Sequence, residues 1–403
     1  MKFSRDLLIS LLAVCLALAA VEGGLRLAQV RFNASLYRSV PRLGFGLRPG
    51  AEGWNVDENE AYVRINRAGW RDRERTLARP ADTLRIAVVG SCEVDARQVA
   101  MERTFETVIQ RETEKRAANH ARHVEVLNFG VPGYTFSQNY LSLIDAAFAY
   151  DPQVVILVLQ PFNYLRNTRE LYPGDTLGTP FYRLENGKLV EDEMTRTAVP
   201  PDPRNVARHA RFADAMNMSY TLSLANSARL QLQRLLGQCR AKLHIGETAK
   251  PAPVHVGFEE LRYTPDHPDA LKSWAIGDAF VELMKAECER RGIEFRIVTV
   301  DDNAATHPDP AMREAFRHRM NVPVIDAAER KIAQFCERRG IPLLLPGAAV
   351  LAYAEAHHTF LHGNVKLGDN MGFWNAEGHE VIGQLISNDL LQGSAKVREF
   401  VQR

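Results

Sequence analysis

Cys92 lies just after a predicted buried strand, at a position where a turn could hold a nucleophile. Residues 84–99 read LRIAVVGSCEVDARQV, an apolar run that ends at Gly90 and then turns polar. A thiolate attacks acyl carbonyls well when a neighbouring base lowers the pKa of its thiol. The nearest charges in sequence, Glu93 and Asp95, would instead raise that pKa by like-charge repulsion. Chemistry at this turn therefore depends on a base supplied by another part of the chain.

Alternating strand and helix patterns from residue 84 onward indicate how that turn is held. Short apolar runs at 85–90, 124–128, 154–159, 294–300 and 342–345 are typical of strands buried in a parallel sheet. Helical patterns at 104–117, 137–149, 269–291 and 326–338 lie between them. This order predicts a doubly wound, flavodoxin-like three-layer α/β/α fold with a central parallel sheet, preceded by an N-terminal hydrophobic helix. The loops after the first three strands should then meet at one sheet edge.

Four blocks along the chain carry a resemblance to a known family. They read VVGSCEV, LNFGVPGYTF, VLQPFNYLRN and, near the end, NMGFWNAEGH. Together they resemble the SGNH/GDSL ester hydrolases, particularly the membrane-anchored bacterial members, which commonly read VLGDSFT-x-G, LNAGVPGYGT, G-N-D and DGHWNAEGH. The lead-in VRINRAGWRDRE resembles those members too, so the likeness spans nearly the whole chain. It implies acyl transfer by a Ser nucleophile, a His base and an orienting Asp, with an oxyanion hole.

Carried over position by position, the resemblance implies an incomplete triad. The nucleophile position falls on Cys92, and the oxyanion-hole positions fall on Gly130 and Asn163. The positions of the catalytic His and Asp fall on Phe373 and Met371, which can neither accept nor polarise a proton. The groups that bind the substrate are retained and those that transfer its protons are replaced. Losing general acid–base catalysis typically costs roughly 10²–10⁴-fold in rate.

Two functions follow from this pattern. The first is an SGNH-like extracytoplasmic protein without standard serine esterase activity, which binds an acylated carbohydrate or lipid or supports an acyltransferase or esterase partner protein. The alternative is an active thiol esterase or O-acyltransferase, in which a loop shift brings His362 and Asp369 to Cys92 as replacements. A His ring nitrogen within hydrogen-bond reach of the Cys92 sulfur would favour the enzyme. Nucleotide binding is disfavoured, because no G-x-G-x-x-G or P-loop Lys follows the first strand.

The composition and the N-terminal residues limit the classes of binding partner and the cellular locations that we expect. A formal net charge of +1 gives no electrostatic reason to expect nucleic acid as a partner. No grouping with metal-ligand spacing occurs, and we expect no cofactor. Lys2 and Arg5 precede an apolar run over 7–21, which predicts a signal peptide or membrane anchor within 1–30. The expected location is the bacterial cell envelope, either anchored in the inner membrane and facing the periplasm or exterior, or secreted after cleavage.

The remaining segments complete the predicted organisation. Residues 31–83 form a β-rich lead-in, and residues 84–167 and 269–403 form the SGNH-like α/β domain. Residues 168–268, rich in Pro and charge, are expected as an insertion or cap over the carboxyl edge of the sheet. Cys288 and Cys336 lie in similar helical contexts, KAECERRG and AQFCERRG, and a bridge between them is an open alternative to two buried thiols.

Overall fold

The centre of the chain is a five-stranded parallel sheet. The structure is a computed structural model, which describes residues 2–117, 122–172, 178–198, 202–242, 258–364 and 372–402. Strand order is β11-β10-β7-β5-β6, all parallel. The bounds are β5 Thr83–Gly90, β6 His123–Gly130, β7 Val154–Leu159, β10 Glu294–Thr299 and β11 Leu343–Leu344. The predicted doubly wound α/β fold and all five predicted strands are confirmed.

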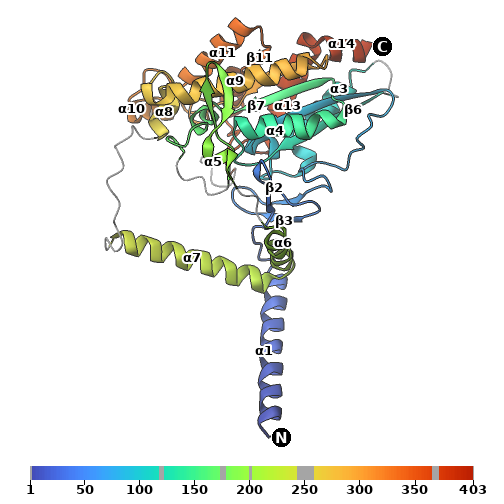
Figure 1. Cartoon of the computed structure of the whole chain (residues 1–403), viewed down its shortest axis with the longest axis vertical. Helices are drawn as coiled ribbons and strands as arrows, with labels where there is room; N and C mark the ends of the chain where they lie inside the picture. Colours follow the sequence, from blue (N-terminus) through green and yellow to red (C-terminus); the bar gives the residue numbers. More distant parts are fainter. Residues whose placement is uncertain are drawn as a thin grey trace.

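Both faces of this sheet are covered by helices, as Figure 1 shows. Along β5, Leu84, Ile86 and Val88 face one core while Ala87 and Val89 face the other, because side chains alternate along a strand. The first core includes residues of α3 (Phe105–Glu114), α12 (Gly347–His357), α13 (Ala376–Gly393) and α14 (Ala395–Gln402). The second includes residues of α4 (Phe136–Asp145), α9 (Pro268–Glu289) and α11 (Ala327–Arg339). Burial on both faces explains why the strands read as continuous apolar runs.

The lead-in is β-rich, with two antiparallel pairs. These are β1 (Tyr37–Val40) with β2 (Gly44–Leu47), and β3 (Glu52–Asn55) with β4 (Ala61–Arg64). A small core joins Leu36, Phe45 and Leu47 to Val131 and Tyr134, which follow β6. The lead-in therefore packs against the carboxyl edge of the sheet.

The insertion differs from the cap that we expected over the sheet edge. Its hairpin of β8 (Tyr182–Glu185) and β9 (Lys188–Glu191) packs on α9 and is followed by α5 (Glu193–Arg196). Helices α6 (Pro203–Met218) and α7 (Tyr220–Lys242) instead pack on each other, α6 against β1 and α7 against the N-terminal helix (Figure 1). Among the described residues of the insertion, Pro180, whose carbonyl accepts a hydrogen bond from Ser137, and α8 (Phe258–Tyr263), which packs on η3 (Pro161–Arg166), do come to the sheet edge.

Two further predictions concern the N-terminal helix and the two cysteines of the core. Helix α1 (Lys2–Leu27) contains, over Arg5–Leu27, a segment long and apolar enough to cross a membrane, and all of its leucines except Leu25 are exposed. Cys288 and Cys336 are free thiols buried in the core, so the alternative of a bridge between them was wrong. Three short turns, α2 (Cys92–Asp95), η1 (Met101–Arg103) and η2 (Ala147–Tyr150), and the helix α10 (Pro310–Arg319) are the other elements.

Candidate functional site

Cys92 begins α2, directly after β5 ends at Gly90. The hydroxyl of Ser91 donates to the Cys92 sulfur at 3.7 Å and itself accepts a hydrogen bond from the Gly133 N–H at 3.0 Å. Burial raises the pKa of the Cys92 thiol above its ordinary value, and the negative charge of Glu93 adds to the rise. A raised pKa keeps the group a thiol at neutral pH, the less nucleophilic form.

The two predicted oxyanion-hole residues lie on the neighbouring loops and make structural contacts. The Gly130 N–H donates to Asn128 Oδ1 at 2.9 Å, and a Cβ at position 130 would lie 2.4 Å from the Asp95 nitrogen. Asn163 donates from Nδ2 to the Tyr134 carbonyl at 3.2 Å. The three loops thus adjoin at one sheet edge, while the oxyanion role of both residues stays a prediction.

The last block places Phe373 at this edge. Its N–H donates to Glu58 Oε2 at 3.2 Å, so the lead-in contacts the loop in which a family member would carry its base. Met371 and Asp369, the other residues predicted on this loop, lie outside the described residues.

His362 is paired with a carboxylate other than the one we predicted. Its Nε2 lies 2.9 Å from Asp301 Oδ2, and both side chains are buried. Asp301 follows β10, and it also accepts hydrogen bonds from Trp374 Nε1 at 2.8 Å and Thr306 Oγ1 at 2.8 Å. Burial disfavours the Asp301 carboxylate, but these partners hold the pKa of that carboxyl below its usual range. The partner of His362 in the described structure is therefore Asp301, from the loop after the fourth strand.

The second ring nitrogen of His362 also faces an oxygen. Nδ1 lies 3.2 Å from the Gly372 carbonyl, which can only accept a hydrogen bond. An imidazole that donates from both nitrogens carries both protons. Burial opposes that charge, yet Asp301 and Glu93 raise the pKa of His362 to about 9. In this arrangement His362 is a cation without a lone pair to take a proton from Cys92.

Glu93 completes a buried group of three ionisable side chains. Its Oε2 accepts the Trp374 N–H at 3.3 Å, and its Oε1 lies 3.5 Å from Gln160 Nε2. Burial raises the pKa of Glu93 to about 8, and the nearby His362 opposes the rise. Carboxyls with strongly raised pKa values in a cleft are typical of functional sites.

These three side chains line a cleft of about 320 Å³ at the carboxyl edge of the sheet. Its remaining walls combine two aromatic rings with polar side chains; the lining residues include Gln160, Phe162, Arg262, Asn303 and Phe373. Apolar surface with a few placed polar groups is the usual make-up of small-molecule sites.

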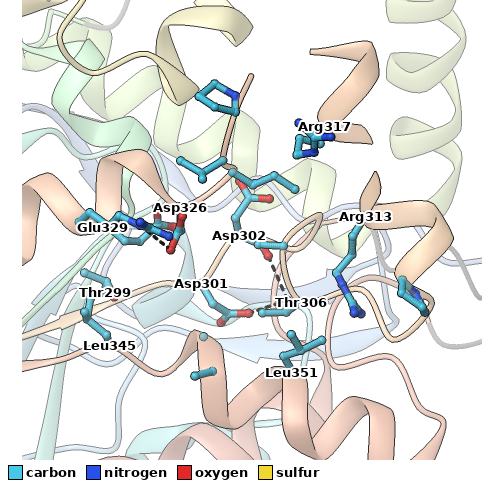
Figure 2. A pocket seen from close by; sticks show the side chains of 18 of the residues that line it. Thr299, Asp301, Asp302, Thr306, Arg313, Arg317, Asp326, Glu329, Leu345 and Leu351 are labelled. Carbon is cyan, nitrogen blue, oxygen red and sulfur yellow. Dashed lines mark hydrogen bonds and ion pairs between the residues drawn. The ribbon is translucent and has the colours of Figure 1, made fainter. Parts of the chain in front are cut away.

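A second cavity of about 610 Å³ lies against the same aspartate. Asp301 lines both spaces. Figure 2 shows Asp301, Asp302 and Thr306 on one wall of the cavity, with Asp326 and Glu329 on the side opposite the two arginines of α10. Apolar side chains supply much of the remaining lining: Pro310, Pro323, Val324, Ile325, Leu345 and Leu351.

His379, by contrast, is a structural histidine. Its ring stacks on Phe105, its Nδ1 accepts the Phe105 N–H at 3.2 Å, and Gln98 lies 3.2 Å from its Nε2. Burial lowers the pKa of His379 to about 3, so it is neutral at physiological pH.

Sequence reasoning missed Asp301 and Glu93 as members of the site. The signal for Asp301 was present, because the predicted fourth strand runs directly into Val300-Asp301-Asp302 and its loop opens at the same edge as the first three. Glu93 was considered only for its charge beside Cys92, whereas its side chain is buried and lines the cleft.

Comparisons with known proteins find no matching family model and no matching curated protein. Similar solved structures include a lipase/acylhydrolase from Enterococcus faecalis, 11% identical over 76% of this chain and 95% of that one, with a TM-score of 0.34. A GDSL-like lipase from Bacteroides thetaiotaomicron is 9% identical over 76% and 88%, with a TM-score of 0.32. An acetyl xylan esterase is 10% identical over 76% and 100%, with a TM-score of 0.37. One of these neighbours is a GDSL-like lipase, the kind of hydrolase that the four sequence blocks resemble, and likeness at this level carries no argument about activity.

Proposed function

We propose that this chain is a membrane-anchored, extracytoplasmic SGNH-hydrolase-like protein that binds an ester-linked acyl ligand and does not cleave it through a serine or thiol nucleophile. One observation carries the proposal: both ring nitrogens of His362 face acceptor oxygens, on Asp301 and Gly372. His362 therefore offers Cys92 no lone pair, and burial raises the pKa of the Cys92 thiol. A protein of this kind would present its ligand to an acyltransferase or esterase partner.

The two adjoining spaces suit an amphiphilic ligand. The polar cleft, with Gln160 and Asn303 beside Phe162 and Phe373, offers hydrogen bonds and ring faces to a sugar or headgroup. The larger cavity offers apolar walls to an acyl chain. Since Asp301 lines both spaces, a ligand with a polar and an apolar part would span it.

Binding and turnover are tested on the full chain in detergent. We expect acetylated xylo-oligosaccharide or a lysophospholipid to bind by calorimetry, and the deacylated forms to bind more weakly. We expect no multiple turnover of p-nitrophenyl acetate, with the Cys92→Ala variant indistinguishable from the unchanged chain. Turnover past one equivalent that disappears in Cys92→Ala would contradict the proposal and support the thiol enzyme.

Two neighbouring alanines on α12 allow a matched test of whether an acyl chain binds in the larger cavity. Ala348 lines the cavity, whereas its neighbour Ala349 on α12 is exposed and does not. Ala348→Phe should weaken binding of a long-chain lysophospholipid and leave binding of a short acetyl ester unchanged, while Ala349→Phe changes neither. If both variants changed the binding affinity equally, the acyl chain would not bind in this cavity.

A second function, ester hydrolysis by water, is favoured by the position and raised pKa of Glu93. In such a reaction the Glu93 carboxylate takes a proton from water, and the water oxygen bonds to the ester carbonyl carbon. The ester C–O bond then breaks, and the His362 imidazolium gives up its contact with the Gly372 carbonyl and protonates the leaving alkoxide. Its rate would rise with pH through about 8 and fall above about 9. Turnover that persists in Cys92→Ala and is lost in Glu93→Gln would identify this function.

A further inference from the structure

Helix α7 reverses the usual orientation of an amphipathic surface helix. After its first two residues, the half-buried residues in the first half of α7 are Ser223, Asn226 and Ser227, spaced so that they share one face, and Ser223 donates to the Met216 carbonyl of α6 at 2.7 Å. The opposite half of its circumference is apolar and exposed; it carries Leu224, Ala225, Ala228, Leu232, Leu235 and Leu236. We call this the leucine face. In a soluble protein, a surface helix normally packs its apolar face against the rest of the domain, so these leucines would be buried.

The exposure of the leucine face is large. Leu232 and Leu235 are each 57% exposed and Leu236 is 50% exposed. Contiguous exposed apolar surface of this kind marks an interaction site in a soluble or peripheral protein. Among the described residues of the α/β domain, no helix presents a comparable row of leucines.

The amino end of α7 is tied to the end of the candidate membrane span. Glu22 of α1 accepts hydrogen bonds from the backbone N–H groups of Tyr220 and Thr221, at 3.1 and 2.9 Å, and from the Ser219 hydroxyl at 3.0 Å. A carboxylate there also complements the positive end of the α7 dipole. Glu22 directly follows the apolar run of α1, so α7 departs from the place where that run ends.

We propose that α7 lies in the plane of the membrane, with its leucine face in the boundary between lipid headgroups and acyl chains. The proposal rests on α1 being retained as the anchor. In Figure 1, α7 runs crosswise to α1 from the carboxyl end of α1, so an α1 that spans the bilayer places α7 along its surface. The 23 residues of α7 fit the usual length of helices that lie in this boundary.

Two features favour lipid over a second copy of the chain as the occupant. The leucine face lies on a helix that is tied to α1 at Glu22, and α1 exposes apolar side chains whose occupant is lipid when it spans the membrane. Arg229, exposed at the border of the leucine face, is placed to meet anionic headgroups.

The test places single tryptophans in the full chain and reconstitutes it into phosphatidylglycerol-containing vesicles with brominated acyl chains, which quench nearby indoles. Leu232→Trp reports on the leucine face, and Leu230→Trp, two residues away and also exposed, reports on the opposite side of the same helix. Leu12→Trp reports on α1. Quenching of the four native tryptophans, measured in the unchanged chain, is subtracted.

We expect quenching of the added indole to be roughly twofold or more greater at position 232 than at position 230, and high at position 12. Equal, weak quenching at 232 and 230 with strong quenching at 12 would overturn the α7 proposal and leave the anchor intact. Weak quenching at all three positions would overturn the anchor. Weak quenching at 232 together with crosslinks between α7 helices of two chains would assign the leucine face to a second copy.

Discussion

The charge of His362 decides whether the site has a base, and the Asp301→Asn variant tests that charge. In the folded chain the pKa of His362 rises from 6.5 to about 9. At about 1.4 kcal/mol per unit, the fold prefers the imidazolium by about 3 kcal/mol. Asn keeps a carbonyl oxygen for Trp374 or Thr306 but removes the negative charge. We therefore expect the variant to lose about 3 kcal/mol of stability at pH 7, in the range of a broken buried ion pair.

The pH dependence has a definite sign. Because the folded pKa of His362 lies above its unfolded value, the stabilisation is fully present below about pH 6.5 and is lost as pH rises through about 9. The difference in unfolding free energy between the unchanged chain and Asp301→Asn should therefore be largest near pH 6 and shrink by pH 10. Denaturant unfolding of both proteins at these two pH values measures it.

A direct titration can refute the reasoning. The ring carbon of His362 is assigned by NMR as the histidine resonance missing from a His362→Gln variant, among 12 histidines. We expect its midpoint near pH 9 in the unchanged chain and clearly lower in Asp301→Asn, where only Glu93 and the Gly372 carbonyl still oppose the effect of burial on the ring. A midpoint at or below 6.5 in the unchanged chain would show a neutral imidazole, which has a lone pair for Cys92, and would restore the thiol enzyme.

Three further outcomes follow from single residues. Cys92→Ser should gain no esterase turnover over the unchanged chain, because a hydroxyl needs a base even more than a thiol does; measurable multiple turnover would disprove this. Gly130→Ala should destabilise the chain by about 1–3 kcal/mol, since its Cβ would meet the Asp95 nitrogen at 2.4 Å, whereas Gly347→Ala, with no contact closer than 3.7 Å, should not lower the melting temperature. Stability should fall as pH drops from 6.5 toward 3, because the unfolded chain protonates His379 and the fold does not; a His379→Phe variant should show a shallower acid dependence in thermal unfolding.

The sequence predicted the sheet well because the physics of its strands is local. Residues buried on both faces must be apolar in succession, and β7 begins and ends where that run does. The ends of helices could also be predicted from the sequence. Gly340, for example, adopts the left-handed conformation at the end of α11, and β11 follows. The candidate site was predicted only as far as its loops: Cys92 and Asn163 lie at the same edge.

The charged partners could not be predicted in the same way. Which carboxylate meets His362 depends on how the segment before α13 folds across the sheet edge, where His362 pairs with Trp374 in an isolated bridge. That bridge brings the His362 ring to Asp301, 61 residues away in sequence. Spacing along the chain favoured Asp369 because it is near in sequence, and tertiary packing selected a residue that is near in space.

The lead-in, residues 31–83, connects α1 to the loops around the cleft. The same short segment that follows α1 packs Phe45 against Tyr134 at the carboxyl edge of the sheet, and its Asn59 donates to the Gly363 carbonyl beside His362 at 3.1 Å. The residues that follow the candidate membrane span therefore contact the loops that line the cleft. If α1 is retained as a membrane anchor, as we propose, this connection ties the cleft to the bilayer and favours a lipid-linked ligand over a freely soluble one.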